Sequence, residues 1–108
     1  MHENVVSCIY MKVIPKPMAF IWDKGNTDKN PSKHGVTNQE TEEAFFDQKR
    51  KILRDTLHSQ NEDRYILLGK TKQGLILFIV FTIREKGIRV ISARKMNRRE
   101  EYLYEKKA

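Results

Sequence analysis

Cysteine is almost absent from this chain, since Cys8 is the only one among 108 residues. A single cysteine excludes an internal disulfide and any metal cluster built from cysteines. The apolar run at residues 75–83 is far too short to span a bilayer. The first residues also lack the charged, apolar and small-residue segments of a secretory signal. These absences predict a cytoplasmic protein without a membrane segment.

Other common functional signatures are missing as well. The chain has no glycine-rich phosphate loop, no internal repeat and no low-complexity segment. Aspartates and histidines do not recur at the spacing of metal ligands. We therefore expect neither a metal nor another cofactor.

Positive charge is what the chain has in excess. Lysine and arginine number 21 against 14 acidic residues, which gives a net charge of +7 and an isoelectric point of about 9.6. Such a field favours polyanionic partners, meaning nucleic acid or an acidic protein. The alternative is a small basic domain that is only well solvated, because a basic isoelectric point discriminates weakly.

The second half of the chain predicts three consecutive strands, at residues 65–70, 75–83 and 88–94. The middle one is apolar at nearly every position, which is typical of a strand covered on both faces. The turns between them, around Gly74 and Gly87, are too short for a parallel crossover. The pattern therefore indicates an antiparallel meander, followed by a basic helix that begins near Lys95.

The first half predicts shorter elements. Residues 20–23 form a short strand, and residues 24–34 have helical character that Pro31 must shorten. Thr37 and Glu40 have the spacing of a capping box, which predicts a second helix at about residues 38–48.

Two further features complete the predicted organisation. Ile52 and Leu53 are compatible with a brief strand before the polar loop of residues 56–63. Residues 1–17, broken by Pro15 and Pro17, predict a poorly ordered extension, and residues 18–108 then form the single domain.

Taken together, four blocks of this sequence resemble the BrnT toxins of bacterial type II toxin–antitoxin pairs. Order and spacing hold from about Phe20 to the C-terminus. The blocks are Phe20-Ile21-Trp22-Asp23; Asn30 with Lys33-His34-Gly35-Val36; Asp55, His58-Ser59, Glu62 and Arg64 before Tyr65-Ile66-Leu67-Leu68-Gly69; and Val80-Phe81-Thr82, Arg89-Val90-Ile91-Ser92-Ala93-Arg94, Arg99-Glu100 and Tyr104.

The resemblance implies a RelE-like ribonuclease toxin of α+β class. Its small antiparallel sheet, the meander plus the short N-terminal strand, would pack with two N-terminal helices and a basic C-terminal helix. The implied partner is a BrnA-like antitoxin that carries the DNA-binding domain, so operator DNA would be contacted only through it. The chain departs from the family pattern at Pro31 and in residues 1–17, which have no counterpart.

RNA cleavage without a metal needs a base, an acid and cations for the developing phosphorane charge. The resemblance points to His58 for proton transfer, with a pKa near 6.5 in an unperturbed histidine. The meander brings Arg84 near Arg64, which makes these three residues the predicted catalytic cluster. The alternatives are a loop histidine bonded to backbone and arginines that are solvated or paired with Glu62.

RNA contacts beyond that cluster are assigned to Lys33, His34, Arg94, Arg98 and Arg99. Arg94 closes the third strand, so roughly 17–20 Å separates it from Arg64 in a meander. Arg94 could instead anchor the last helix, and His34 could be a capping or packing residue. Of the C-terminal aromatics, Tyr102 could stack on a base, whereas Tyr104 has the spacing of a core residue.

Three functions remain open from sequence. The first is an endoribonuclease toxin inhibited by its antitoxin. The second is a non-catalytic nucleic-acid-binding or co-repressor subunit that acts with the antitoxin. The third is a general RNA-binding module, for which binding would depend steeply on salt without cleavage.

Overall fold

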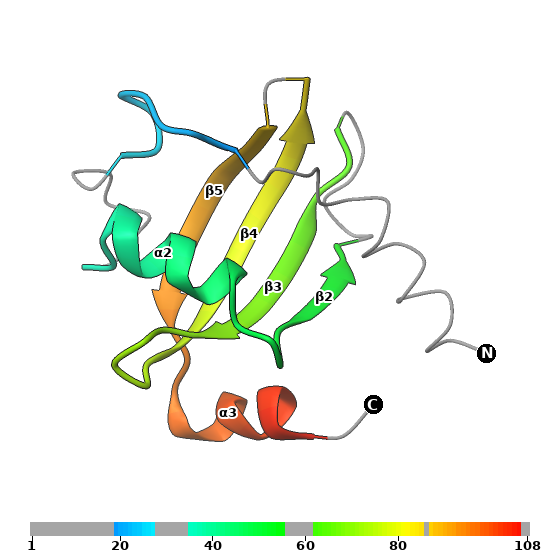
Figure 1. The fold of residues 1–108 in the computed structure, drawn as a ribbon. Helices are drawn as coiled ribbons and strands as arrows, with labels where there is room; N and C mark the ends of the chain where they lie inside the picture. The colour runs from blue at the N-terminus through cyan, green and yellow to red at the C-terminus, as the bar shows by residue number, and fades with distance from the viewer. Residues whose placement is uncertain (1–18, 28–34, 56–61, 86, 107–108) are drawn as a thin grey trace.

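A five-stranded sheet forms the centre of the molecule (Figure 1). The computed structural model describes residues 19–27, 35–55, 62–85 and 87–106. The strands lie in the order β1-β5-β4-β3-β2. Their bounds are β1 Phe20–Ile21, β2 Lys51–Arg54, β3 Tyr65–Lys70, β4 Ile76–Arg84 and β5 Gly87–Lys95, and the helices are α2 Asn38–Phe45 and α3 Arg98–Glu105.

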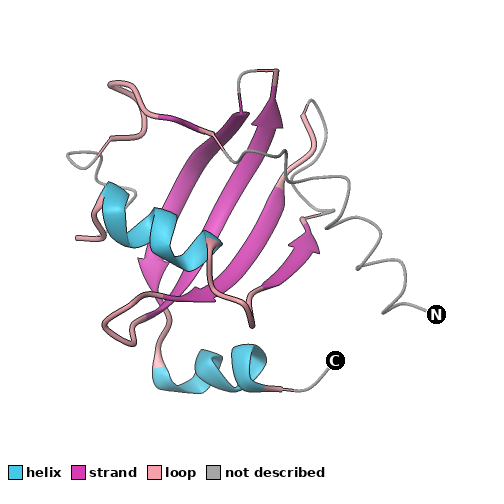
Figure 2. Cartoon of the chain, viewed as in Figure 1, coloured by secondary structure: helices cyan, strands magenta, loops and turns pink. Residues whose placement is uncertain are grey.

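The predicted fold class is wrong in three respects. The sheet is mixed, because β1 pairs with β5 in parallel while every other pairing is antiparallel. It has five strands, because β2 pairs with β3 and extends the meander. Among the described residues one helix, α2, precedes β3, instead of two N-terminal helices (Figure 2).

Local patterns explain these errors. Residues 24–27 form a turn, not the start of a helix, and residues 28–34 lie outside the described part. In this turn the Asn26 side chain accepts from the Asp23 amide and donates to the Ile21 carbonyl, which satisfies backbone groups without a helix. The proposed extension at residues 1–17 also lies outside the described residues and stays a prediction.

Helix α2 packs in front of the sheet in the view of Figure 1. Thr37 closes the predicted capping box, since its hydroxyl accepts from the Glu40 amide and the Glu40 carboxylate accepts from the Thr37 amide. The helix buries Ala44 and Phe45 completely. Phe45 meets Phe81 of β4 edge-on, with 5.0 Å between ring centroids, and this contact centres the main core.

A β-bulge in β5 decides which side chains face α2. Val80 pairs with Ser92 and Phe81 pairs with Val90, so Ile91 is the extra residue. Before the bulge, Ile88 and Val90 point into the main core; after it, Ala93 does. The bulge therefore shifts the alternation by one position and puts Arg89 on the same face as Arg94, opposite α2.

Helix α3 lies at the lower end of the sheet in Figure 1, and its contacts are with the face opposite α2. Asn97 begins it with a second capping box, in which Glu100 is the reciprocal partner. Tyr104 and Met96 pack there on Leu68 and Ile76 as a smaller second core. None of the described helices is long and apolar enough to cross a membrane.

Arg94 joins the end of β5 to α3. Its two terminal nitrogens donate to the two Glu100 oxygens at 2.7 and 2.8 Å, and its guanidinium lies 4.5 Å from the Phe78 ring centroid. The hydrogen bonds from Arg94 and then from the Asn97 backbone lower the pKa of Glu100 to about 2. This predicted RNA-binding arginine is therefore occupied in anchoring the last helix.

A substitution at Gly69 tests how closely α2 packs on the sheet. A Cβ at this position would lie 2.4 Å from the carbonyl oxygen of Ala44. We expect Gly69→Ala to lower the free energy of unfolding by about 1–3 kcal/mol, because the backbones must separate. Urea denaturation measures the change, with exposed Gln73→Ala as the control. Equal stability of Gly69→Ala and the wild type would contradict this contact.

Glu100 tests the attachment of α3. Its folded-state pKa of about 2 lies below its ordinary 4.5, so the stabilisation is present above pH 4.5 and is lost as the pH falls through 2. We expect Glu100→Gln, which keeps a capping side chain, to cost about 1–2 kcal/mol at pH 7 after solvent screening. Denaturation at pH 7 and near pH 2 measures the difference in the free energy of unfolding between the variant and the wild type at each pH.

Glu101→Gln is the control for that variant, since it removes a charge from the same helical turn without touching Arg94. Two results would show that the Arg94 pair is not the cause of the lower stability of Glu100→Gln. One is a stability loss that persists near pH 2, and the other is an equal stability loss in Glu101→Gln.

Candidate functional site

Three arginines lie at one end of the sheet on the face opposite α2. Arg84 ends β4, Arg89 pairs with Thr82 near the start of β5, and Arg64 directly precedes β3. Arg64 shares the face of Ile66 and Leu68 by strand alternation. Among the described residues no helix covers this end, because α3 packs at the other one (Figure 1). We call Arg64, Arg84 and Arg89 the arginine cluster.

Glu62 holds Arg84 in place. The Arg84 Nε and Nη2 atoms donate to its two carboxylate oxygens at 2.8 and 3.1 Å. The hydrogen bond from Arg84 is the largest cause that lowers the pKa of Glu62, and the charges of Arg84 and Arg64 add to it. Arg64 and Arg84 therefore act on one carboxylate, as expected from the direction of the strands.

Asp23 holds Arg89 in the same way. The Arg89 Nη1 atom lies 2.6 Å from Asp23 Oδ2, while Asp23 Oδ1 accepts from the Gly25 amide. These two hydrogen bonds, the first the larger, lower the pKa of Asp23, and Arg84 also lowers it through its charge. Arg84 thus lies between two carboxylates, one on each side.

Arg89 was missed as a site residue by sequence reasoning. Strict alternation places Arg89 and Arg94 on opposite faces of a strand, since five residues separate them. The bulge at Ile91 removes that difference. The available signal is the apolar pair Val90-Ile91, where the alternation that begins at Ile88 breaks off.

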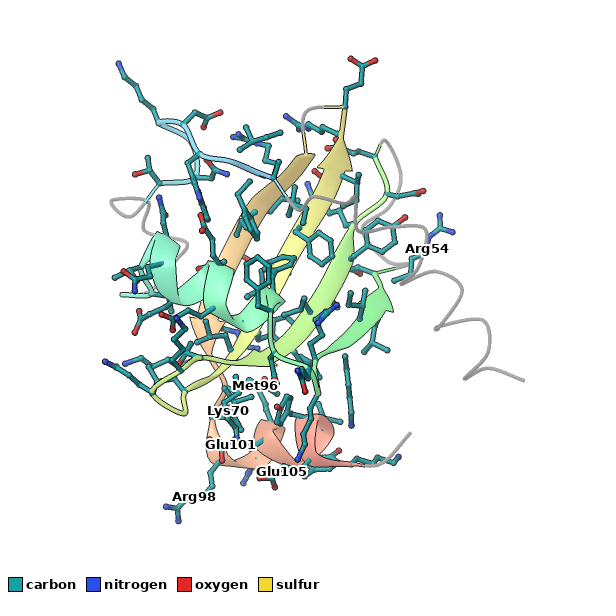
Figure 3. All side chains as sticks on the ribbon, viewed as in Figure 1. Arg54, Lys70, Met96, Arg98, Glu101 and Glu105 are labelled. Carbon is teal, nitrogen blue, oxygen red and sulfur yellow. The ribbon has the colours of Figure 1, made fainter. Side chains whose placement is uncertain are left out.

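The predicted RNA contacts on the C-terminal side lie elsewhere on the molecule. Arg94 pairs with Phe78, which is four residues from Thr82 along β4, or about 13 Å in an extended strand. Arg98 and Arg99 are exposed in the first turn of α3. Figure 3 shows Arg98 extending away from the body of the molecule. These residues form a second basic surface, separate from the arginine cluster.

Three of the predicted site residues lie outside the described part of the chain. They are His58, Lys33 and His34. His58 lies in the segment 56–61, which directly precedes Glu62 in the sequence. Its place relative to Arg64 and Arg84 stays a prediction.

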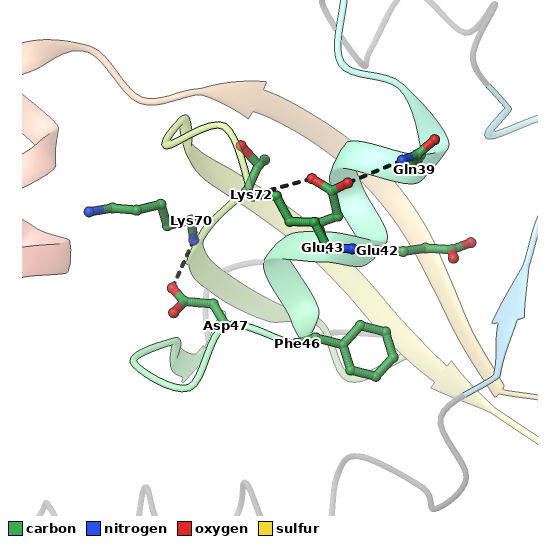
Figure 4. Close-up of a pocket in the computed structure, with 8 residues that line it drawn as sticks. Gln39, Glu42, Glu43, Phe46, Asp47, Lys70 and Lys72 are labelled. Atoms are coloured by element: carbon green, nitrogen blue, oxygen red, sulfur yellow. Dashed lines mark hydrogen bonds between the residues drawn. The ribbon is translucent and has the colours of Figure 1, made fainter.

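A pocket on the other side of the sheet is lined by more acidic than basic residues (Figure 4). It is open, with a volume of about 500 Å³, and lies between α2 and the β3–β4 turn. Glu43 accepts from the Lys72 amide and Asp47 from the Lys70 amide, so two carboxylates fix its walls. Its lining residues are Gln39, Glu42, Glu43, Phe46, Asp47, Lys70, Thr71 and Lys72.

The arginine cluster can bind phosphate. Guanidinium groups pair two phosphate oxygens and stay charged at any working pH. The pair between Arg84 and Glu62 is half exposed, with side-chain exposures of 49% and 37%, so a phosphate group can reach the guanidinium. A phosphate can pair with Arg84 in the same bidentate way as the carboxylate does. Among the described residues no group of three or more His, Cys, Asp or Glu could hold a metal ion.

Comparison with known proteins supports the same kind of chemistry. Residues 22–100 match the family model of BrnT, described as the ribonuclease toxin of type II toxin–antitoxin systems. The match contains Asp23, Glu62 and all three residues of the arginine cluster. Comparison with curated proteins gives no match. Because the family model covers most of the sequence, the chain belongs to the BrnT family of type II ribonuclease toxins.

Proposed function

We propose that the chain is a metal-independent endoribonuclease whose active site is the arginine cluster, working in the cytoplasm. The observation that carries the proposal is the presence of three arginines at one end of the sheet that no described helix covers, each from a different segment. Two carboxylates hold Arg84 and Arg89 there through hydrogen bonds of 2.6 to 3.1 Å, and the charge of Arg64 acts on one of these carboxylates, Glu62. The family description supplies the substrate class.

In this proposal the arginines stabilise the transition state. Attack of a 2′-hydroxyl on the adjacent phosphate adds negative charge to the non-bridging oxygens. Arg84 already donates to both carboxylate oxygens of Glu62, and the charge of Arg64 acts on the same group. A phosphate in place of that carboxylate would receive the Arg84 donors and the charge of Arg64 as its own charge develops.

Proton transfer is assigned to His58. The other candidate base is Glu62, the carboxylate that pairs with Arg84. Arg84 and Arg64 lower its pKa, and a strongly acidic carboxyl group is a poor base at neutral pH. A histidine titrates in the right range. His58 would take the proton of the 2′-hydroxyl or give one to the leaving 5′-oxygen.

Flanking phosphates of the RNA are assigned to the other basic residues. Arg98 and Arg99 offer exposed side chains on α3, and Lys33 and His34 are included from the sequence. Arg94 contributes less in this proposal than the sequence predicts, because Glu100 occupies both of its terminal nitrogens.

The partner of the chain is an antitoxin, as membership of the type II family implies. We propose that it is BrnA-like, that it neutralises the ribonuclease, and that it alone contacts operator DNA. The second candidate function, a non-catalytic co-repressor subunit, would use the arginine cluster as a docking surface for the antitoxin. Cleavage by the purified chain separates the two.

RNA cleavage by single-site variants tests this proposal. We expect Arg84→Ala and Arg64→Ala each to slow cleavage of a single-stranded RNA by about 10²- to 10³-fold, because a donor to the developing charge is removed. His58→Ala is expected to lose activity to a similar extent. Purified full-length variants are mixed with the RNA in EDTA, and new ends are located by primer extension.

The control is Lys72→Ala, which removes an exposed cation from the β3–β4 turn on the α2 side of the sheet. It should cleave like the wild type. If Arg84→Ala and Lys72→Ala fold and cleave equally well, the arginine cluster is not the active site. If the folded wild type does not cleave at all, the co-repressor function replaces the ribonuclease.

A further inference from the structure

Strand β2 is the outermost strand on one side of the sheet. The Asp55 amide donates to the Arg64 carbonyl, 2.8 Å away, so residues 55 and 64 form a hydrogen-bonded pair. In an antiparallel ladder the bonded pairs alternate, which makes 53–66 and 51–68 the next two. The backbone N–H and C=O groups of Ile52 and Arg54 therefore point away from β3, toward the outer edge of the described sheet.

No described residue bonds these outward groups. Among the described residues, no backbone hydrogen bond outside the strand ladders involves Ile52 or Arg54. An edge with open donors and acceptors is a template for another strand. The four residues of β2 offer two such positions.

Apolar side chains next to this edge are exposed. Leu53 keeps 45% of its surface and Leu103 of α3 keeps 40%. Both lie near Lys51, since Lys51 shares the face of Leu53 and its Nζ donates to the Leu103 carbonyl. Exposed leucines beside an open strand edge are unusual for a monomer that protects its edges, and they suit a partner side chain.

The charge at this edge selects an acidic partner. Lys49, Arg50 and Lys51 enter β2, and Arg54 ends it. Figure 3 shows Arg54 at the outer margin of the sheet. Arg54 pairs with Asp63 with half of each side chain exposed, so a partner carboxylate can exchange with Asp63 at little cost.

We propose that an extended, acidic segment of the antitoxin adds to β2 as a sixth strand. Its backbone would bond the open groups of Ile52 and Arg54, and an apolar side chain would cover Leu53 and Leu103. The proposal rests on the antitoxin partnership of the proposed function and not on the ribonuclease site. It also places the antitoxin along β2, and Asp55, the residue after β2, is bonded to Arg64 of the arginine cluster.

A proline at residue 54 tests the backbone contact. Proline is tolerated on an edge strand where its nitrogen faces outward, so Arg54→Pro removes the outward N–H and keeps the ladder to β3. Arg54→Thr is the matched control, because it removes the same side chain and keeps the N–H. Circular dichroism of both variants confirms that they fold.

Affinity for the antitoxin encoded with the chain is then measured with the full-length proteins. We expect Arg54→Pro to bind at least about tenfold more weakly than Arg54→Thr, since a backbone hydrogen bond and the close approach of the strand are lost. Amide hydrogen exchange should slow at Ile52 and Arg54 when the antitoxin binds the wild type.

Three outcomes would overturn the proposal. One is equal affinity of the two variants with unchanged exchange at Ile52 and Arg54. Another is protection of both amides in the free chain that rises with concentration, which would assign the edge to a second copy. The third is protection in the free chain that disappears when residues 1–18 are deleted. If the wild type does not cleave RNA, the ribonuclease proposal is contradicted, but the result of this binding test is not affected.

Discussion

The pairing of β4 with β5, with its bulge at Ile91, is the constraint on which the candidate site depends. The bulge lets Ile88, Val90 and Ala93 all reach the main core, although they do not share one alternation. Arg89 lies between Ile88 and Val90 and therefore points to the face opposite α2, next to Arg84, and the bulge keeps Arg94 on that face as well. Burial of the apolar residues of β5 thus fixes where its charged residues point.

Each face of the sheet has a separate role. Helix α2 and the aromatic contact of Phe45 with Phe81 close one face, and the pocket on that side is walled by carboxylates. The opposite face is divided between α3, anchored by Arg94 and Glu100, and the end with the arginine cluster, which no described helix covers. Three arginines and their two carboxylate partners thus lie on one face, while Glu43 and Asp47 brace the β3–β4 turn on the other.

Much of the secondary structure was predictable from the chain. The ranges of β3, β4 and β5, the capping box at Thr37 and a brief strand at Ile52 all follow from local patterns. The partners of the edge strands did not, because two to four residues carry no information on which neighbour they pair with. Arg84 was placed beside Arg64 by strand direction alone. Arg89 was not found, since its contact with Asp23 depends on the pairing of β1 with β5, and the anchoring of Arg94 depends on where α3 docks.

The most direct test of the account is an NMR titration of the full-length chain with a short single-stranded RNA whose 2′-hydroxyl at the cleaved position is replaced by hydrogen. Such an RNA binds without being cut. The side-chain Nε–H signals of arginine report each guanidinium separately. The account predicts that Arg64, Arg84 and Arg89 shift together, at the same RNA concentration, with smaller changes at Arg98 and Arg99. Shifts at Arg98 and Arg99 with none at the three clustered arginines would contradict it.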